Sequence, residues 1–346
     1  MKILCVGPLW RGSNAGGLFK AMSRKGALIE VVDEFYHIPL SAKMLKAKII
    51  SKVLRSVYIE DFNFEILNMA RKFGPDAVLV YKGAFVKPQT LLALKEMKVK
   101  LYNFYPDVSF HTHGGLLKHT LGLYDKIFTT KTFGIQDFGE QLGINDCIFI
   151  PHGYDPEIHK PIHREMIPKG FFCDVSFIGT YSPKKEKILS AIKDRFPNID
   201  LKIWGTQWEK SAMPQIKNCL QNQGIFGDLY AAGICASKIN LGILSEQVRG
   251  ASSGDLITSR TFHIPAAGGF LLHEKNKESI LYFQDAKEAG FFENTEDLLQ
   301  KIEYYLKEEQ ERIEISIAGM KRANKDHSLD QRANRVLGHM DFIGAN

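Results

Sequence analysis

The apolar residues of the chain fall into short runs separated by segments of helical spacing. Six such runs follow one another in the first half: "KILCVG", "LIEVVDEF", "PDAVLVYKG", "KLYNFYP", "DKIFTTK" and "CIFIPHG". Loops rich in small residues or helix-like stretches such as "FEILNMARKFG" lie between most of them. Strands that alternate with helices predict a parallel β-sheet covered by helices on both faces.

A second series of the same kind follows a proline-rich stretch. "IPHGYDPEIHKPIHREMIPKG" loses the apolar pattern and holds four prolines, which is typical of an interdomain connection. Strand-like runs then return in "DVSFIGTYSPKKEKILSAI", "LKIWG", "SKINLGIL" and "GFLLHE". A chain of 346 residues usually forms two domains with a ligand crevice between them. We therefore predict a Rossmann-like domain at 1–153, a linker at 154–170 and a second Rossmann-like domain at 171–325.

Composition narrows the range of partners. The net charge of +6, from 45 Lys and Arg against 39 Asp and Glu, is too small for a nucleic-acid-binding protein and suits a phosphorylated small molecule. The five cysteines lack a paired metal spacing. The first apolar run is too short for a signal peptide, and no segment reaches the roughly 18 apolar residues of a membrane span. We expect the protein in the cytoplasm or at the inner membrane surface.

The loop after the first apolar run is a candidate ligand loop. In open parallel sheets ligands bind beyond the carboxyl ends of the strands. "RGSNAGG", with Ser13, Asn14 and Gly16, allows backbone N–H groups to approach an anion or sugar hydroxyls, although a plain tight turn explains the run equally well. It lacks the Gly-x-Gly-x-x-Gly spacing, which argues against an NAD-dependent dehydrogenase.

Asp107 and His111 lie in a second polar loop, "YPDVSFHTHGG". We rank hydrogen bonding to substrate or proton handling first for these residues, structural roles second and zinc binding third. A tetrahedral zinc site needs three or four ligands, and no further His or Cys set is spaced to complete one. We therefore expect no metal and no cofactor.

The third loop, in "FIGTYSPKKE", places Gly179 and Thr180 after a strand and two lysines at the start of the next helix. Backbone donors, a helix N-terminus and ammonium groups at one point suit a pyrophosphate. A lysine pair alone usually marks a solvated helix face, so the interpretation depends on the preceding Gly-Thr pair.

The fourth candidate is the stretch "DLITSRTFHIPAAGGFLLHE". Thr258 and Ser259 can cap a helix here, so that the first-turn N–H groups point toward a phosphate, with Arg260 and His263 projecting nearby. Asp255 lies just ahead of that turn. A capped helix that leads through a Gly-Gly turn into a buried strand explains the residues equally well.

The order of these segments resembles that of a known family. "DVSFIGTYSPKKEKIL", "LKIWGTQW", "YAAGICASKINLGI", "DLITSRTFHIPAAGGFLLHE", "FFENTEDLLQKIEYYL" and "HSLDQRANRVL" are similar to the CgeB-like (spore maturation protein) glycosyltransferases, related to family 4 glycosyltransferases. "PDAVLVYKG", "YNFYPD" and "IPHGYDPEIHKP" resemble the family more loosely. The resemblance implies the α/β GT-B fold: two Rossmann-like lobes facing a cleft, the acceptor bound by the first, the sugar nucleotide by the second, and a C-terminal helix at 326–346 packing back on the first.

The resemblance also implies roles for single residues. Related enzymes carry two acidic residues separated by seven others, and Asp255 takes the first place, whereas His263 stands where the family typically has Glu. Lys185 stands where the family often has Arg and keeps a cation without the bidentate fork. The acidic pair suggests a retaining reaction, in which Asp107 and His111 position sugars. In an inverting reaction either of them would accept the acceptor proton.

Leaving-group chemistry supports the same set of residues. A metal-independent transferase must stabilise a departing nucleoside diphosphate with N–H dipoles and cations. The expected donor-binding residues are Gly179, Thr180, Lys185, Phe226 at an apolar edge for the base, Thr258, Ser259, Arg260 and His263. The expected catalytic residues are Asp107, His111, Asp255 and Arg260, and the expected acceptor-binding residues are Ser13, Asn14, Gly16 and Asp107.

The sequence thus predicts a glycosyltransferase of polysaccharide biosynthesis that uses a UDP- or GDP-linked sugar and a glycan, lipid-linked or protein acceptor. Two alternatives stay open: a non-catalytic nucleotide- or sugar-binding scaffold, motivated by His263, and a nucleotide-sugar epimerase. The basic amphipathic stretch 42–56 either contacts an anionic membrane peripherally or covers the first sheet.

Overall fold

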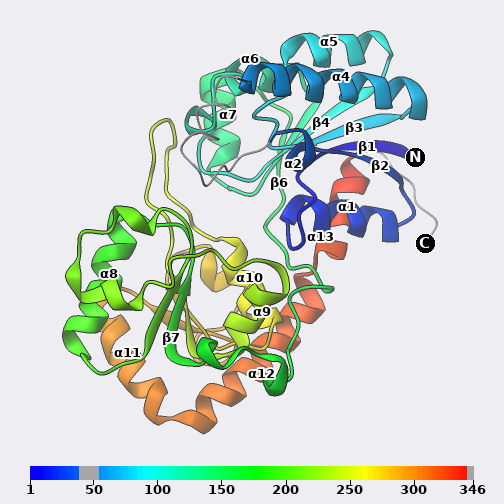
Figure 1. The fold of residues 1–346 in the computed structure, drawn as a ribbon. Helices are drawn as coiled ribbons and strands as arrows, with labels where there is room; N and C mark the ends of the chain where they lie inside the picture. The colour runs from blue at the N-terminus through cyan, green and yellow to red at the C-terminus, as the bar shows by residue number, and fades with distance from the viewer. Residues whose placement is uncertain (39–53, 341–346) are drawn as a thin grey trace. The chain divides into compact units, whose positions relative to one another are not determined.

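The computed structural model describes residues 1–38 and 54–340 (Figure 1). The stretch 42–56, a candidate for membrane contact, lies outside the described residues except for its last three positions. The chain divides into two compact units. Unit 1 comprises Met1–Pro151, Gln247–Ser253 and Asp330–Asn346, and unit 2 comprises His152–Glu246 and Gly254–Leu329.

Unit 1 is built around a six-stranded sheet in the order β2-β1-β3-β4-β5-β6, and every pairing is parallel. Its strands are β1 (Lys2–Gly7), β2 (Leu28–Asp33), β3 (Ala77–Tyr81), β4 (Lys100–Tyr105), β5 (Lys126–Thr129) and β6 (Cys147–Phe149). Its helices are α1 (Asn14–Arg24), α2 (Glu34–His37), α4 (Arg55–Phe73), α5 (Pro88–Glu96), α6 (Leu117–Thr120), α7 (Gly134–Leu142) and α13 (Leu329–His339), with short 3-10 turns at Phe110–Thr112 and Leu121–Leu123.

Helices cover both faces of this sheet. Figure 1 shows α4 and α5 over one face and α1 with α13 over the other. Apolar side chains of α4 and α5, such as Phe62 and Leu91, pack on fully buried strand residues such as Leu4 and Val78. On the other face, the C-terminal helix is held by Arg24, whose Nε lies 2.8 Å from the Asp330 carboxylate.

Unit 2 contains a five-stranded parallel sheet in the order β11-β10-β9-β7-β8. Its strands are β7 (Cys173–Ile178), β8 (Leu201–Trp204), β9 (Ser237–Gly242), β10 (Leu271–Glu274) and β11 (Gly290–Phe292). Its helices are α8 (Pro183–Arg195), α9 (Gly227–Cys235), α10 (Ser259–Ala266), α11 (Thr295–Lys307) and α12 (Glu309–Asp326), with 3-10 turns at Arg164–Met166, Lys169–Phe171, Trp208–Lys210, Pro214–Cys219 and Ser279–Leu281.

The second sheet is also a buried layer between helices. On one face, its core joins Leu189 of α8 and Leu298 of α11 to Phe177 of β7. Helices α9 and α10 lie on the opposite face, where Ile264 approaches Ile178. The predicted α/β fold with two parallel sheets is therefore confirmed. Among residues 1–38 and 54–340, no helix has both the length and the apolar character of a membrane span.

Candidate functional site

The carboxyl ends of β7 and β9 define the candidate site in unit 2. After β7 the chain runs to β8 on one side of the sheet, and β9 then pairs with β7 on the other side. Such a reversal opens a crevice at the strand ends, where ligands of parallel sheets bind. Gly179 and Thr180 follow β7, Ser245 lies beyond β9, and helix α10 begins after Thr258. The topology thus brings together two of the loops that the sequence singled out, those of Gly179 and Thr258, and adds Ser245 to them.

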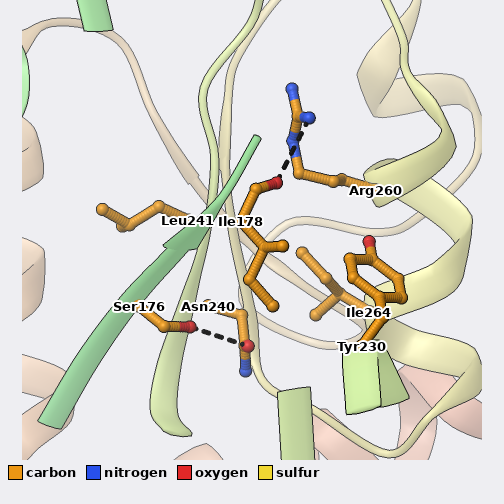
Figure 2. Close-up of a pocket in the computed structure, with 7 residues that line it drawn as sticks. All are labelled: Ser176, Ile178, Tyr230, Asn240, Leu241, Arg260 and Ile264. Carbon is orange, nitrogen blue, oxygen red and sulfur yellow. Dashed lines mark hydrogen bonds between the residues drawn. The ribbon is translucent and has the colours of Figure 1, made fainter. Parts of the chain in front are cut away.

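Arg260 projects from the first turn of α10 over this strand edge (Figure 2). Its Nη2 donates to the Ile243 carbonyl oxygen at 2.9 Å, and its Nη1 makes a longer contact of 3.5 Å to that of Ile178. The guanidinium lies 5.2 Å from the Phe177 ring centroid, a cation–π distance. Its Nε is buried without a hydrogen-bond partner, and burial lowers the pKa of Arg260 below its usual value. Arg260 forms no ion pair with a carboxylate of the described residues.

Beside Arg260 lies a narrow crevice between the two central strands and helices α9 and α10 (Figure 2). Its floor is polar but satisfied, because Ser176 Oγ donates to Asn240 Oδ1 at 3.1 Å and Asn240 Nδ2 donates to the Ile234 carbonyl. Tyr230 forms part of its wall. The unpartnered Nε of Arg260 is therefore the donor that an incoming acceptor atom would satisfy.

Lys185 is the second cation of the site. Its side chain is 4% exposed, and its Nζ donates to the Thr180 carbonyl at 3.2 Å and to Ser245 Oγ at 3.0 Å. Burial, and then the charge of Arg260, lowers the pKa of Lys185 to about 8. The neighbouring Lys184 instead pairs with Glu274 at 2.6 Å. Two cations without a carboxylate partner of their own, held near each other, form a place that favours an anion.

The backbone around these cations is closely packed. Gly205 has a φ of +147°, and a Cβ there would clash with the Gly179 carbonyl oxygen, so only glycine fits. The residues that follow these two glycines, Thr180 and Thr206, lie side by side, with their hydroxyl oxygens 3.2 Å apart. At the start of α10, the Thr258 N–H donates to Thr261 Oγ1 at 3.0 Å. In the same turn, the Thr261 N–H donates to the Thr258 carbonyl at 3.1 Å.

His263, predicted to bind the donor, is a buried residue. Its ring is 5% exposed and stacks on His159, with 3.6 Å between ring centroids. Its Nε2 lies 3.1 Å from the Gly153 carbonyl oxygen, so this nitrogen carries a proton and donates it. Burial lowers the pKa of both rings, that of His159 to about 3. His263 is thus placed to hold the segment that begins unit 2, and its predicted donor-binding role remains a prediction.

The other predicted donor residues lie around the same strand ends. Asp255 is half-buried, and its N–H donates to the Ser245 carbonyl at 3.0 Å. Ser259 Oγ lies 3.3 Å from His152 Nδ1. Phe226, the residue before α9, is 55% exposed, as a stacking surface for a base requires. The sequence missed Ser245, because a lone serine gives no signal.

Asp107 follows β4 in unit 1 and forms an ion pair that the sequence did not reveal. The Lys82 ammonium lies 2.8 Å from Asp107 Oδ2, and His113 Nε2 lies 3.5 Å from the same oxygen. Burial alone would raise the pKa of Asp107, but Lys82 and His113 outweigh it and hold the pKa below the usual value. Lys82 adopts a left-handed φ of +65°. Lys82 directly follows strand β3 and precedes Gly83, and this position could have pointed to it in the sequence.

Glu34, the first residue of α2, is a second group that the sequence missed. It is 7% exposed, and burial raises its pKa to about 7, although the nearby charge of Lys82 opposes the rise. Its position directly after strand β2 could have marked it as a candidate site residue in the sequence. Glu34 can therefore carry or release a proton near neutral pH.

The remaining predicted residues of unit 1 take local roles. Ser13 caps α1, since Gly16 N donates to its Oγ at 2.9 Å, and Asn14 is the first residue of that helix. His111 Nε2 lies 2.8 Å from Gln141 Oε1. The acceptor-binding and proton-transfer roles of these residues remain predictions. In the part of the chain that the structure describes, no three His, Cys, Asp or Glu side chains are grouped to hold a metal ion.

Comparison with known proteins finds one matching family model and several structures of the same fold. Residues 184–338 match a family model described as glycosyl transferase-like. No curated protein sequence matches the chain. The chain superposes on HepE of Anabaena in complex with UDP-glucose with a TM-score of 0.66 and 13% identity, covering 99% of both chains.

Two further structures share the fold. A glycosyltransferase from Rickettsia africae gives a TM-score of 0.63 at 14% identity, covering 98% of this chain and 97% of that one. Sucrose-phosphate synthase from Thermosynechococcus elongatus gives 0.64 at 10% identity, covering 99% and 98%. The chain therefore has the GT-B fold that these structures share, as the sequence predicted, and its residues 184–338 are similar to a glycosyl transferase-like family.

Proposed function

We propose that the protein transfers a glycosyl group from a nucleotide-sugar, UDP- or GDP-linked, to a glycan, lipid-linked or protein acceptor. The observation that carries this proposal is the pair of cations at the β7/β9 strand ends. Lys185 is buried and Arg260 is half-buried with a buried Nε, and the two lie near each other without carboxylate partners, an arrangement that is costly unless an anion completes it. The UDP-glucose complex of HepE supports a uridine nucleotide as the first donor to test.

Departure of a nucleoside diphosphate develops negative charge on its terminal phosphate oxygens. Donors fixed in place before the reaction stabilise that charge without reorganising. Arg260 offers its unpartnered Nε, and Lys185 offers its ammonium group. This set performs the stabilisation without a metal ion.

For the sugar, we propose that Asp255 binds a hydroxyl group of the transferred residue in a retaining reaction. Asp107, with its Lys82 partner, would then orient the acceptor. Because Asp107 is ionised and already paired, it is poorly suited to take a proton, which agrees with a positioning role.

The decisive experiment measures UDP binding by calorimetry and UDP release from UDP-glucose and other nucleotide-sugars. Arg260→Gln should abolish both, because it removes the charge and the bidentate donor. Arg322→Gln is the matched control, since Arg322 also lies in unit 2 but pairs with Asp326 on α12. Equal UDP binding by both variants would contradict the proposal.

A non-catalytic scaffold is the second candidate, favoured by the buried and engaged state of His263. The same assays separate the two functions. Binding of nucleoside diphosphates without release from any donor, in the presence of a broad acceptor panel, would establish the scaffold.

A further inference from the structure

The Tyr230 hydroxyl is a polar group of unit 2 that the proposed donor site does not yet use. Tyr230 lies on α9 and lines the narrow crevice beside Arg260, and Figure 2 shows its hydroxyl directed toward the end of the crevice where Arg260 lies. The residue is half-buried, and within residues 1–38 and 54–340 its hydroxyl makes no hydrogen bond. A tyrosine hydroxyl taken out of solvent usually finds a partner. This hydroxyl is therefore available to a ligand.

Two buried histidines of the same unit hold the Tyr230 ring. His159 and His263 stack on each other, with 3.6 Å between their ring centroids, and Tyr230 meets each of them edge to face at 5.7 Å. Aromatic packing of this kind restricts the orientation of a ring. The Tyr230 hydroxyl therefore has a fixed direction before a ligand arrives.

Each histidine is in turn fixed by a main-chain hydrogen bond. His159 Nδ1 accepts the Asp155 N–H at 3.0 Å, and His263 Nε2 donates to the Gly153 carbonyl at 3.1 Å. Burial lowers the pKa of both histidines, that of His159 to about 3, so neither ring is charged at neutral pH. The pair therefore acts on Tyr230 through ring packing, without adding charge to the site.

Tyr230 and Arg260 are two donors that face the same crevice. Burial raises the pKa of the Tyr230 phenol to about 12, although the charge of Arg260 opposes the rise. The hydroxyl therefore keeps its proton at neutral pH and can donate it. The Nε of Arg260 is buried and has no hydrogen-bond partner. Such a pair of donors suits a ligand with several strong acceptor atoms, and phosphate oxygens are of this kind.

The depth of the crevice offers no comparable donors. Ser176 and Asn240 form its floor and bond to each other. The other residues that line it are apolar: Ile178, Leu241 and Ile264. An anion is therefore expected at the end of the crevice where Arg260 and Tyr230 lie, and not deep between the strands.

We propose that Tyr230 binds the diphosphate of the donor: its hydroxyl donates to a phosphate oxygen beside Arg260, and His159 and His263 are positioning residues for it. This inference rests on the proposed function, because it assigns the Arg260 crevice to a nucleoside diphosphate. His263 then takes part in donor binding without touching the donor.

Calorimetry with UDP and with inorganic pyrophosphate tests the hydrogen bond in the full-length protein. Tyr230→Phe removes one oxygen and keeps the ring between the histidines, so the melting temperature should stay the same while both dissociation constants rise about ten-fold. Tyr304→Phe is the matched control, because that exposed tyrosine of unit 2 donates its hydroxyl to Glu311. A loss of affinity for UDP alone would place the hydroxyl on the nucleoside and overturn the proposal.

Variants at His159 test the positioning role. His159→Ala removes a ring that packs on Tyr230 and should weaken pyrophosphate binding, whereas His159→Phe keeps an aromatic ring and should restore most of the affinity. In the Tyr230→Phe background, His159→Ala should cost little further affinity, because the hydroxyl that it positions is already absent. Equal costs in the two backgrounds would show that His159 affects the site by another route.

The outcomes separate this inference from the proposed function. If wild type and Tyr230→Phe bind UDP and pyrophosphate equally well, the donor site stands and the role of Tyr230 is overturned. If Tyr230→Phe weakens pyrophosphate binding but wild type releases a nucleoside diphosphate from no nucleotide-sugar, the role of Tyr230 stands and the transferase function fails. If wild type binds neither UDP nor pyrophosphate, both are wrong.

Discussion

The protonation of Lys185 gives a sharp prediction about donor binding. Burial, and then Arg260, lowers its pKa from 10.5 to about 8, although Asp255 and Glu246 oppose the shift. A bound diphosphate adds negative charge beside the ammonium and favours its protonated form. Above pH 8, UDP must therefore bind together with a proton, and its affinity should fall as the pH rises.

The size of the effect follows from the titration of one group. At pH 7 about nine in ten Lys185 side chains are charged, whereas at pH 9 about one in ten is. If only the charged form binds, the UDP dissociation constant should rise about ten-fold between pH 7 and pH 9, which corresponds to about 1.4 kcal/mol of binding free energy.

Calorimetric titration with UDP at pH 7, 8 and 9 measures this change. Lys185→Arg is the control, because a guanidinium stays charged over the whole range. Any titration of UDP itself affects both proteins equally and cancels in their ratio. The reasoning is refuted if the dissociation constants of wild type and Lys185→Arg change in parallel.

Three further predictions concern stability. Gly205→Ala should lower the free energy of unfolding by more than about 3 kcal/mol, because the new Cβ would meet the Gly179 carbonyl, whereas Gly170→Ala, with open space around it, should leave the melting temperature unchanged. The buried His159, with its pKa at about 3 against the usual 6.5, takes up a proton on unfolding, so denaturant titrations should show stability falling below pH 6.5, and a smaller fall in His159→Phe would confirm the source. Burial raises the pKa of Glu34 from 4.5 to about 7, so its contribution to stability is lost as the pH rises through that range; at pH 8 Glu34→Gln should be more stable than wild type by up to about 3 kcal/mol in urea unfolding, and a less stable variant would contradict this assignment.

Much of the fold and part of the site could be predicted from local pattern. Short apolar runs that alternate with helical spacing specify parallel strands under helices, because both faces of such a sheet must be buried. The candidate site was placed in the loops after those strands, since parallel strands present their carboxyl ends on one edge. The structure places Arg260 and Lys185, each predicted from the helix start in which it stands, near each other at that edge.

The charge state and pairing of each group depended on residues distant in the chain. Lys184 and Lys185 are adjacent and chemically identical, yet one pairs with Glu274 and the other faces Arg260. Their position in the sequence does not distinguish them, because only the folded chain determines which of the two side chains reaches Glu274 of β10. The stacking of His263 on a histidine of another segment is of the same kind.

The sequence by itself determined two parallel α/β sheets and the strand-end loops that hold the candidate chemistry. Tertiary structure alone decided that Lys82 pairs with Asp107 and that its charge lies near the buried Glu34. Hydrophobic periodicity is a local property, because it depends only on the order of neighbouring residues in the sequence. Burial, ion pairing and pKa depend on neighbours in space, which the chain provides only when it is folded.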